Sequence, residues 1–170
     1  TNYDLRYFVA MRMSLARSVS MMVTPNPTTL LRLAQVGAEY AESLIRAIHD
    51  GELGVRLDRT STEDGARQLQ IAEAISARLN PDPARARFIE ASMKGDGVLR
   101  PKDVWTDLSV IGCWLGGSAG VQATWLEGWY GDVPRRDLGL RATEATMTVP
   151  MTDGTAFGVP AFGEVFFEFI

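Results

Sequence analysis

Residues 108–115 (LSVIGCWL), followed directly by residues 116–120 (GGSAG), decide the fold of this chain. The first stretch is a continuous apolar run of strand length, as expected of a strand buried on both faces of a sheet. The glycine-rich stretch ends that strand and leads into a helical segment that reaches Gly131. Residues 133–138 form a second candidate strand. The order strand, glycine loop, helix, strand predicts an α/β fold, a partial doubly wound sheet with flanking helices.

Residues 1–170 are interpreted as a single domain, and residues 101–170 are its strand-rich part. Short apolar runs alternate here with glycine and aspartate turn signals. The remaining predicted segments are a polar loop at 140–144, strands at 146–149 and 164–170, and turns at Asp153-Gly154 and Gly158.

Helical periodicity dominates residues 1–100. Apolar residues three and four positions apart run from Leu30 to Ile48, so one long helix is predicted. Asn26 and Pro27 supply its N-cap and first residue, and Gly51 ends it. Before it we expect a helix at 4–16 and a short buried strand at 18–24. After it we expect a helix that opens at Ser61 or Thr62 and buries Leu69, Ala72, Ile75 and Leu79. A last helix is capped by Asp82 and started by Pro83, with Phe88, Ile89 and Met93 facing inward.

Composition excludes several classes of function. With 170 residues, 46% of them hydrophobic, the chain can build one domain with a real core. Its net charge of −4 and its dispersed basic residues give no footprint for nucleic acid. No apolar stretch is long enough to span a membrane, and no signal peptide is visible. We therefore expect a cytoplasmic protein. The preference for arginine over lysine indicates a GC-rich bacterial genome.

The chain has one cysteine, Cys113, and one histidine, His49. No intramolecular disulfide is possible, and a zinc site built from several Cys and His ligands is excluded. A Ser–His–Asp triad is excluded unless His49 serves in it. His49 lies in the last turn of a predicted helix, where a capping role is expected. Cys113 is expected to be an inert core thiol.

The glycine-rich stretch at 116–120 is the first candidate site. Such a loop lies at the carboxyl edge of an α/β sheet, where ligands bind. Glycines let the backbone approach a ligand, and the helix that follows offers free N–H groups. The stretch is neither a phosphate loop with lysine nor a complete dinucleotide fingerprint. A tight turn from strand to helix remains the alternative.

Residues 142–144 (Ala-Thr-Glu), after the next predicted strand, are the second candidate. A hydroxyl beside a carboxylate can hold Mg²⁺ and touch a phosphate together. The alternative is a solvated turn. Since two consecutive strand ends can line one crevice, the neighbouring glycine loop favours the site.

Three sequence stretches, WLGGSAG (114–120), YGDVPRRDLGLRATE (130–144) and FFEFI (166–170), resemble motifs of the auxin-responsive Gretchen Hagen Three family. That family combines a tryptophan and a glycine loop with G-D-x-P-x-R-D-x-G, Y-x-A-S/T-E and F-F-E-F. A helix ending in D-G-x-L is similar to residues 50–53 (DGEL). The resemblance identifies this chain as an internal fragment of the large domain of an adenylate-forming enzyme.

The resemblance also implies residue roles. Glycine-loop positions place their backbone against adenine and the acyl substrate, and the Y-x-A-S/T-E box contributes an α-phosphate contact and the Mg²⁺ carboxylate. Leu140 stands where the family has a tyrosine that packs on adenine. The implied nucleotide-binding residues are Gly116, Gly117, Ser118, Leu140, Ala142 and Thr143, the catalytic residues are Thr143 and Glu144, and the metal ligand is Glu144.

Three parts of the family pattern are missing: a phosphate loop before the first helix, an R-x-G-D ribose box after the last strand, and the carboxy-terminal lid. We expect the natural protein to continue on both sides and the 170-residue chain alone to be inactive. The implied function of the parent is ATP- and Mg²⁺-dependent activation of a carboxylic acid as an acyl-adenylate, for transfer to an amino acid or a thiol. The alternative is a non-catalytic binding protein that keeps the fold.

Overall fold

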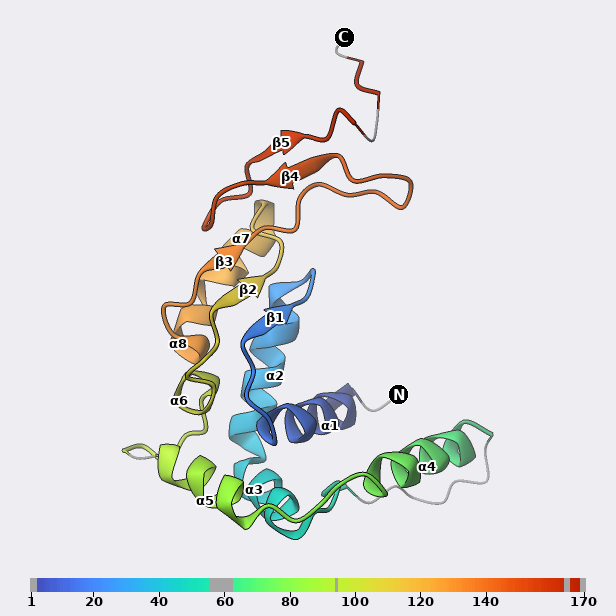
Figure 1. The fold of residues 1–170 in the computed structure, drawn as a ribbon, viewed down its shortest axis with the longest axis vertical. Helices are drawn as coiled ribbons and strands as arrows, with labels where there is room; N and C mark the ends of the chain where they lie inside the picture. The colour runs from blue at the N-terminus through green and yellow to red at the C-terminus, as the bar shows by residue number, and fades with distance from the viewer. Residues whose placement is uncertain (1–2, 56–62, 94, 164–165, 169–170) are drawn as a thin grey trace. The chain divides into compact units, whose positions relative to one another are not determined.

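The computed structural model describes residues 3–55, 63–93, 95–163 and 166–168 (Figure 1). It confirms a mixed α/β fold with a small parallel sheet. The helices are α1 (Tyr3–Leu15), α2 (Pro27–Glu39), α3 (Ala41–Asp50), α4 (Glu63–Ser76), α5 (Pro83–Ser92), α6 (Pro101–Val104), α7 (Gly117–Thr124) and α8 (Leu126–Tyr130). The strands are β1 (Met21–Val23), β2 (Val110–Gly112), β3 (Arg135–Arg136), β4 (Thr148–Pro150) and β5 (Gly158–Pro160).

The described chain forms two compact units. The first takes in the described residues of Thr1–Ser18 and Arg32–Val104, and the second those of Val19–Leu31 and Trp105–Ile170. The first unit is helical, whereas the second contains every strand of the described chain. The division between Leu31 and Arg32 falls within α2, so this helix contributes residues to both units.

The second unit is organised by a parallel sheet in the order β1-β2-β3. Met21 pairs with Val110 on one side of β2, and Ile111 pairs with Arg135 on the other. Ile111 is buried, as expected for a central strand. The predicted strand at 108–115 pairs over only three residues.

The strand predicted at 18–24 exists as β1, but its predicted burial is wrong. Met21 and Val23 are 61% and 59% exposed. β1 lies at the edge of the parallel sheet and pairs on one side only. Because side chains alternate between the two faces of a sheet, Met21 and Val23 share one face, and their exposure shows that this face is open at β1 among the described residues.

Behind the strands, Trp105 and Tyr130 form the core of the second unit. Their rings stack with centroids 6.4 Å apart, and both residues are almost fully buried. The buried Tyr130 hydroxyl donates a hydrogen bond of 2.9 Å to the Leu30 carbonyl. This bond satisfies the polar end of a ring that contributes mainly apolar area. It fixes the end of α8 and therefore the start of the segment that leads into β3.

A two-stranded antiparallel sheet, β4–β5, follows β3. The predicted strand at 146–149 corresponds to β4, and the turn at Asp153-Gly154 is confirmed. The sequence reading was wrong at Gly158, which begins β5 and is not a turn. Phe166–Glu168 forms no strand, and the rest of the strand predicted at 164–170 lies outside the described residues.

In the first unit, the single helix predicted from Pro27 to Gly51 is interrupted at Tyr40, which separates α2 from α3. Tyr40 N still donates to Val36 O (3.0 Å), and Leu44 N donates to Tyr40 O (2.9 Å). Because these helical bonds persist on both sides, the apolar spacing continues through the break. Gly51 ends α3 in the left-handed conformation, as predicted.

Two predictions of burial in this unit are wrong. Phe88 is 44% exposed and packs beneath the Arg85 guanidinium, 4.9 Å from the ring centroid. The stripe predicted for this helix is only half-buried, both on α4 (Leu69, Ala72 and Ile75) and at Leu79, which lies beyond the end of α4. By contrast, Asp82 caps α5 by accepting the Arg85 N–H at 2.9 Å, and Ile89 is fully buried. Ser61 and Thr62, predicted to open α4, lie outside the described residues.

Among the helices of the described ranges, none combines the length and the apolar character needed to cross a bilayer.

Candidate functional site

A pocket of about 400 Å³ opens at the carboxyl ends of β2 and β3. This edge of a parallel sheet is where α/β proteins bind ligands. The pocket volume lies within the range of small-molecule sites. Its lining residues are Trp114, Gly116, Gly117, Ser118, Ala119, Asp137, Gly139, Leu140, Arg141 and Ala156. The structure therefore brings the predicted glycine loop and Leu140 together.

The predicted loop at 116–120 is mostly the first turn of α7, which Gly116 precedes as N-cap. Gly117 has a φ of +55°, and a Cβ built there meets no heavy atom within 4 Å. The backbone at Gly117 is thus open on that side. At Gly120 a Cβ would lie 2.2 Å from the Leu115 carbonyl oxygen. Gly117 leaves room for a ligand, whereas Gly120 allows the helix to pack against the preceding strand end.

Asp137 joins the two walls of the pocket. It is only 6% exposed, and its Oδ2 accepts the Leu115 N–H at 2.6 Å. Its Oδ1 accepts the Gly139 N–H, also at 2.6 Å. One wall follows β2 and the other follows β3, so a single carboxylate ties both strand ends. Hydrogen bonds to an ionised acceptor are stronger than neutral ones.

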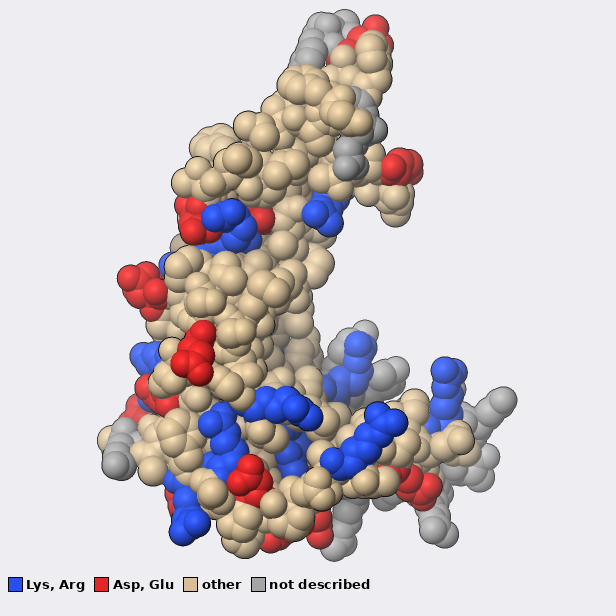
Figure 2. Space-filling view, viewed as in Figure 1, with Lys and Arg blue, Asp and Glu red and all other residues tan. Residues whose placement is uncertain are grey.

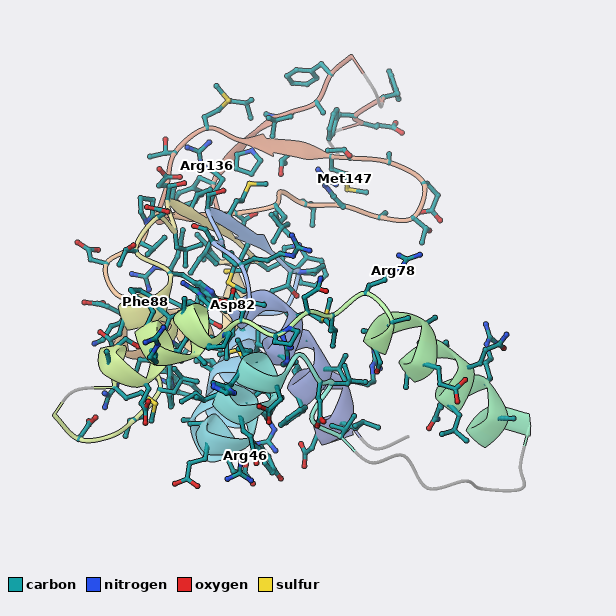
Figure 3. All side chains as sticks on the ribbon, turned by 60° about the horizontal axis from the view of Figure 1, so that its bottom comes forward. Arg46, Arg78, Asp82, Phe88, Arg136 and Met147 are labelled. Carbon is teal, nitrogen blue, oxygen red and sulfur yellow. The ribbon has the colours of Figure 1, made fainter. Side chains whose placement is uncertain are left out.

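Leu140 reaches the pocket from the β3 side and is 62% exposed. Its N–H donates to Thr148 Oγ1 (2.8 Å), and its carbonyl accepts the Met147 N–H (2.8 Å). β4 therefore fixes the backbone of Leu140 and leaves its side chain accessible. Met147, which directly precedes β4, is labelled in Figure 3.

The Ala142–Thr143–Glu144 segment lies in an exposed turn closed by a bridge between Arg141 and Thr146. Ala142 N donates to Ala145 O at 3.0 Å. None of the three residues lines the pocket. A hydrogen bond from Thr143 lowers the pKa of Glu144, which keeps this carboxylate ionised. The pair is thus a ready oxygen donor set, although no cluster of three or more metal-ligating side chains occurs in the described part of the chain.

The model of the GH3 family N-terminal domain matches residues 1–135. The chain belongs to the GH3 family. The motifs at 114–120 and 130–144, which indicated Gretchen Hagen Three, therefore predicted the family correctly. Among curated proteins, no sequence matches this GH3 chain.

Two solved GH3 structures share the fold. A GH3.15 acyl acid amido synthetase is 18% identical, with a TM-score of 0.63 over 85% of this chain. A structure described as an AtGH3.15 acyl acid amido synthetase in complex with 2,4-DB is 16% identical, with a TM-score of 0.65 over 87% of this chain. The GH3 chain described here covers 26% and 25% of their respective lengths.

Cys113, His49 and the two arginines of β3 do not line this pocket of the GH3 chain. Burial raises the pKa of the Cys113 thiol to about 11, as expected of an inert core thiol. His49 Nδ1 lies 2.7 Å from an Asp50 oxygen at the exposed end of α3. Arg136, labelled in Figure 3, pairs with Asp153, and Arg135 donates to the Ala123 carbonyl at 2.9 Å.

Sequence reasoning missed Asp137 and Arg141 as residues of the pocket. Asp137 stands in the quoted R-D-x-G part of the motif, so its position two residues before Gly139 was visible. An aspartate often accepts the N–H two residues on, and that local bond was a usable signal. Its second bond, to Leu115, depends on the pairing of β2 with β3 and could not be read from spacing.

Proposed function

We propose that the whole GH3 protein is an ATP- and Mg²⁺-dependent ligase that activates a carboxylic acid as an acyl-adenylate. The acyl group then passes to an amino acid or, alternatively, to a thiol. One observation carries the proposal: the glycine loop and Leu140 line a single pocket at the carboxyl edge of the parallel sheet. The two similar solved structures are acyl acid amido synthetases, which supports the ligase class.

The residues of the pocket suit a nucleotide. The open backbone at Gly117 offers close approach to a flat or charged group, and Leu140 and Trp114 offer apolar surface to a base. In the proposal, Gly116, Gly117 and Ser118 position adenine and the acid, and Leu140 covers one base face. Ala142, in the exposed turn that follows Leu140, is proposed to contribute to nucleotide binding as well. Positioning of this kind lowers a barrier by holding the reacting groups in place.

Thr143 and Glu144 are proposed to act on the phosphate side. The Thr143 hydroxyl is assigned to an α-phosphate oxygen and the Glu144 carboxylate to Mg²⁺. Mg²⁺ is commonly bound by one or two carboxylates together with substrate phosphates, so one ionised Glu fits this role. When bound, the metal would offset the charge of the phosphates. Glu144 is exposed and ionised, and thus available for that contact.

A second candidate function is a binding protein without catalysis. It is favoured by the positions of Ala142, Thr143 and Glu144, which lie outside the pocket lining, and by Leu140 in place of tyrosine. The proposals of a bacterial source and a cytoplasmic location do not separate the two candidates.

The test measures acid-dependent pyrophosphate release from ATP by the whole protein, with Glu144→Gln and Glu90→Gln as a matched pair. Glu90 is an exposed glutamate on α5 and serves as the control. We expect Glu144→Gln to lower the rate on the order of 10²-fold, the scale of losing one electrostatic stabiliser. Glu90→Gln is expected to be unchanged. Wild-type protein that binds ATP without releasing pyrophosphate supports the second candidate, and a fully active Glu144→Gln with normal Mg²⁺ dependence removes Glu144 from the metal role.

A further inference from the structure

A second pocket, of about 430 Å³, lies in the helical unit and is lined by three arginines, Arg12, Arg17 and Arg78. Its walls come from α1, from Ile48 of α3 and from the segment that joins α4 to α5. Figure 3 labels Arg78 and Asp82 on that joining segment. Figure 2 shows basic side chains gathered over the helices of this unit. Nothing in the proposed adenylation chemistry uses this pocket.

Arg12 is the unusual member of the group, because its side chain is buried in a helical core at 1% exposure. Its Nε donates to Glu52 O (2.9 Å) and its Nη2 to Ala47 O (3.0 Å). Its Nη1 has no hydrogen-bond partner among the described residues. Within the described ranges, no carboxylate lies at salt-bridge distance from this guanidinium.

A buried charge without a counter-ion is costly, on the order of several kcal/mol in proteins. Of its two carbonyl partners, Ala47 lies in the last turn of α3 and Glu52 just beyond that helix, so the partial negative charge of the helix end offsets part of the cost. Among the described residues, no carboxylate forms a direct ion pair with it. Burial accordingly lowers the pKa of Arg12 from its usual value. An anion in the adjoining pocket would supply the missing charge.

Arg17 and Arg78 are exposed, and neither forms an ion pair with another described residue. Asp82 is the acidic residue of the lining, but its Oδ1 already accepts the Arg85 N–H and so serves the start of α5. The arginines therefore outnumber the carboxylate by three to one. Met13, Ile48, Leu79 and Pro81 supply apolar wall between them.

We propose that this pocket binds a small organic oxyanion, a carboxylate or a phosphate ester with an apolar part. Guanidinium groups match the oxygen geometry of both anions and form paired hydrogen bonds with them. The apolar wall suits the organic part, and the volume is that of a small-molecule site. The site is separate in sequence and in unit from the glycine-loop pocket, so the proposal does not depend on the proposed function.

The test is a titration of isotopically labelled protein followed by backbone amide chemical shifts at constant ionic strength. Inorganic phosphate and benzoate are the two probes, and they separate the phosphate from the carboxylate as the preferred anion. We expect shifts at Ala16, Leu79 and Asn80 and a Kd on the order of 1 mM for the better probe. Arg17→Ala and Arg78→Ala should each weaken binding about threefold, the scale of an exposed ion pair. Arg12→Met should weaken it about tenfold or more.

Arg67→Ala is the matched control, since Arg67 is an exposed arginine of α4 in the same unit and lines none of the pockets described here. It should leave binding unchanged. If Arg12→Met does not fold, the exposed Arg17 and Arg78 variants carry the test. The proposal is overturned if neither probe shifts the pocket amides at about 50 mM. It is equally overturned if the Arg17→Ala/Arg78→Ala double variant binds as tightly as wild type.

Discussion

Asp137→Asn is the sharpest perturbation that the structure offers, because one carboxylate holds two backbone N–H groups from different strand ends. Asparagine has nearly the same shape but one acceptor oxygen. It can satisfy either Leu115 or Gly139, and its NH₂ group must then face the N–H of the other. The variant thus loses one charge-assisted bond and leaves one buried donor unpaired.

The expected cost follows from these two contributions. A hydrogen bond to a charged group contributes roughly 1.5–3 kcal/mol, and an unpaired buried donor costs about 1–3 kcal/mol. Removing the buried charge of Asp137 returns part of this. We expect a loss of about 2–4 kcal/mol in the free energy of unfolding, a large share of the roughly 5–15 kcal/mol typical of a domain. For a chain of this size the melting temperature should fall by about 5–15 °C.

Urea unfolding measures the total cost, and amide hydrogen exchange at Leu115 and Gly139 locates it. At least one of these two amides should exchange faster in Asp137→Asn. Asp153→Asn is the matched control, because Asp153 makes an exposed ion pair with Arg136 and should contribute less than about 1 kcal/mol. Equal stability of Asp137→Asn and wild type, with both amides still protected, would refute the role of the carboxylate as the link between the pocket walls.

Three other perturbations have defined outcomes. Gly120→Ala should destabilise the protein by about 1–3 kcal/mol, since its Cβ would meet the Leu115 carbonyl oxygen; calorimetric melting checks this, and an unchanged melting temperature contradicts it. The raised pKa of Cys113 makes stability fall as pH rises from about 9 towards about 11, because the unfolded thiol ionises first. Urea titrations should show a larger loss over this pH range in wild type than in Cys113→Ala, and equal losses contradict the prediction. Leu140→Tyr in the whole protein should tighten ATP binding by ~1 kcal/mol, about fivefold, by adding aromatic stacking, and calorimetry that finds no gain would separate Leu140 from the base.

The fold was predictable where a local pattern has one physical meaning. An unbroken apolar run before glycines, as at 108–120, fits a central strand and the turn that follows it. The cap residues Asn26 and Asp82 were correct because their side chains bond to N–H groups only two or three residues away. Such bonds are nearly independent of tertiary structure.

Patterns that depend on distant contacts were misread. Tyr40 interrupts a helix without disturbing its apolar spacing, so periodicity could not show the break. Phe88 has the residue type of a core position but is covered by Arg85 and left exposed. Gly158 was predicted as a turn, yet it fits the start of β5, an edge strand that pairs on one side only.

The candidate site was predictable in part for a geometric reason. Consecutive parallel strands end at one edge of a sheet, so the glycine loop and residues 142–144 were expected to line one crevice. The pocket instead joins the glycine loop to Leu140, two residues before that segment. The roles of Thr143 and Glu144 stay predictions, because the described turn places both side chains in solvent. Asp137 escaped notice because its role requires knowledge of which backbone N–H groups the fold brings to it.

The topology of the parallel sheet has a consequence for folding kinetics. The hydrogen bond from Ser109 Oγ to the Ser20 carbonyl joins the segments that lead into β2 and β1, and it spans 89 positions. The hydrogen bond from Leu115 N–H to Asp137 spans only 22. Closing the longer loop costs about 1.2 kcal/mol more in chain entropy. We therefore expect β2, α7, α8 and β3 to assemble early and β1 to join late. During that interval the β2 edge is unpaired, and a chain lacking its first 30 residues would keep this edge permanently open to strands of other molecules.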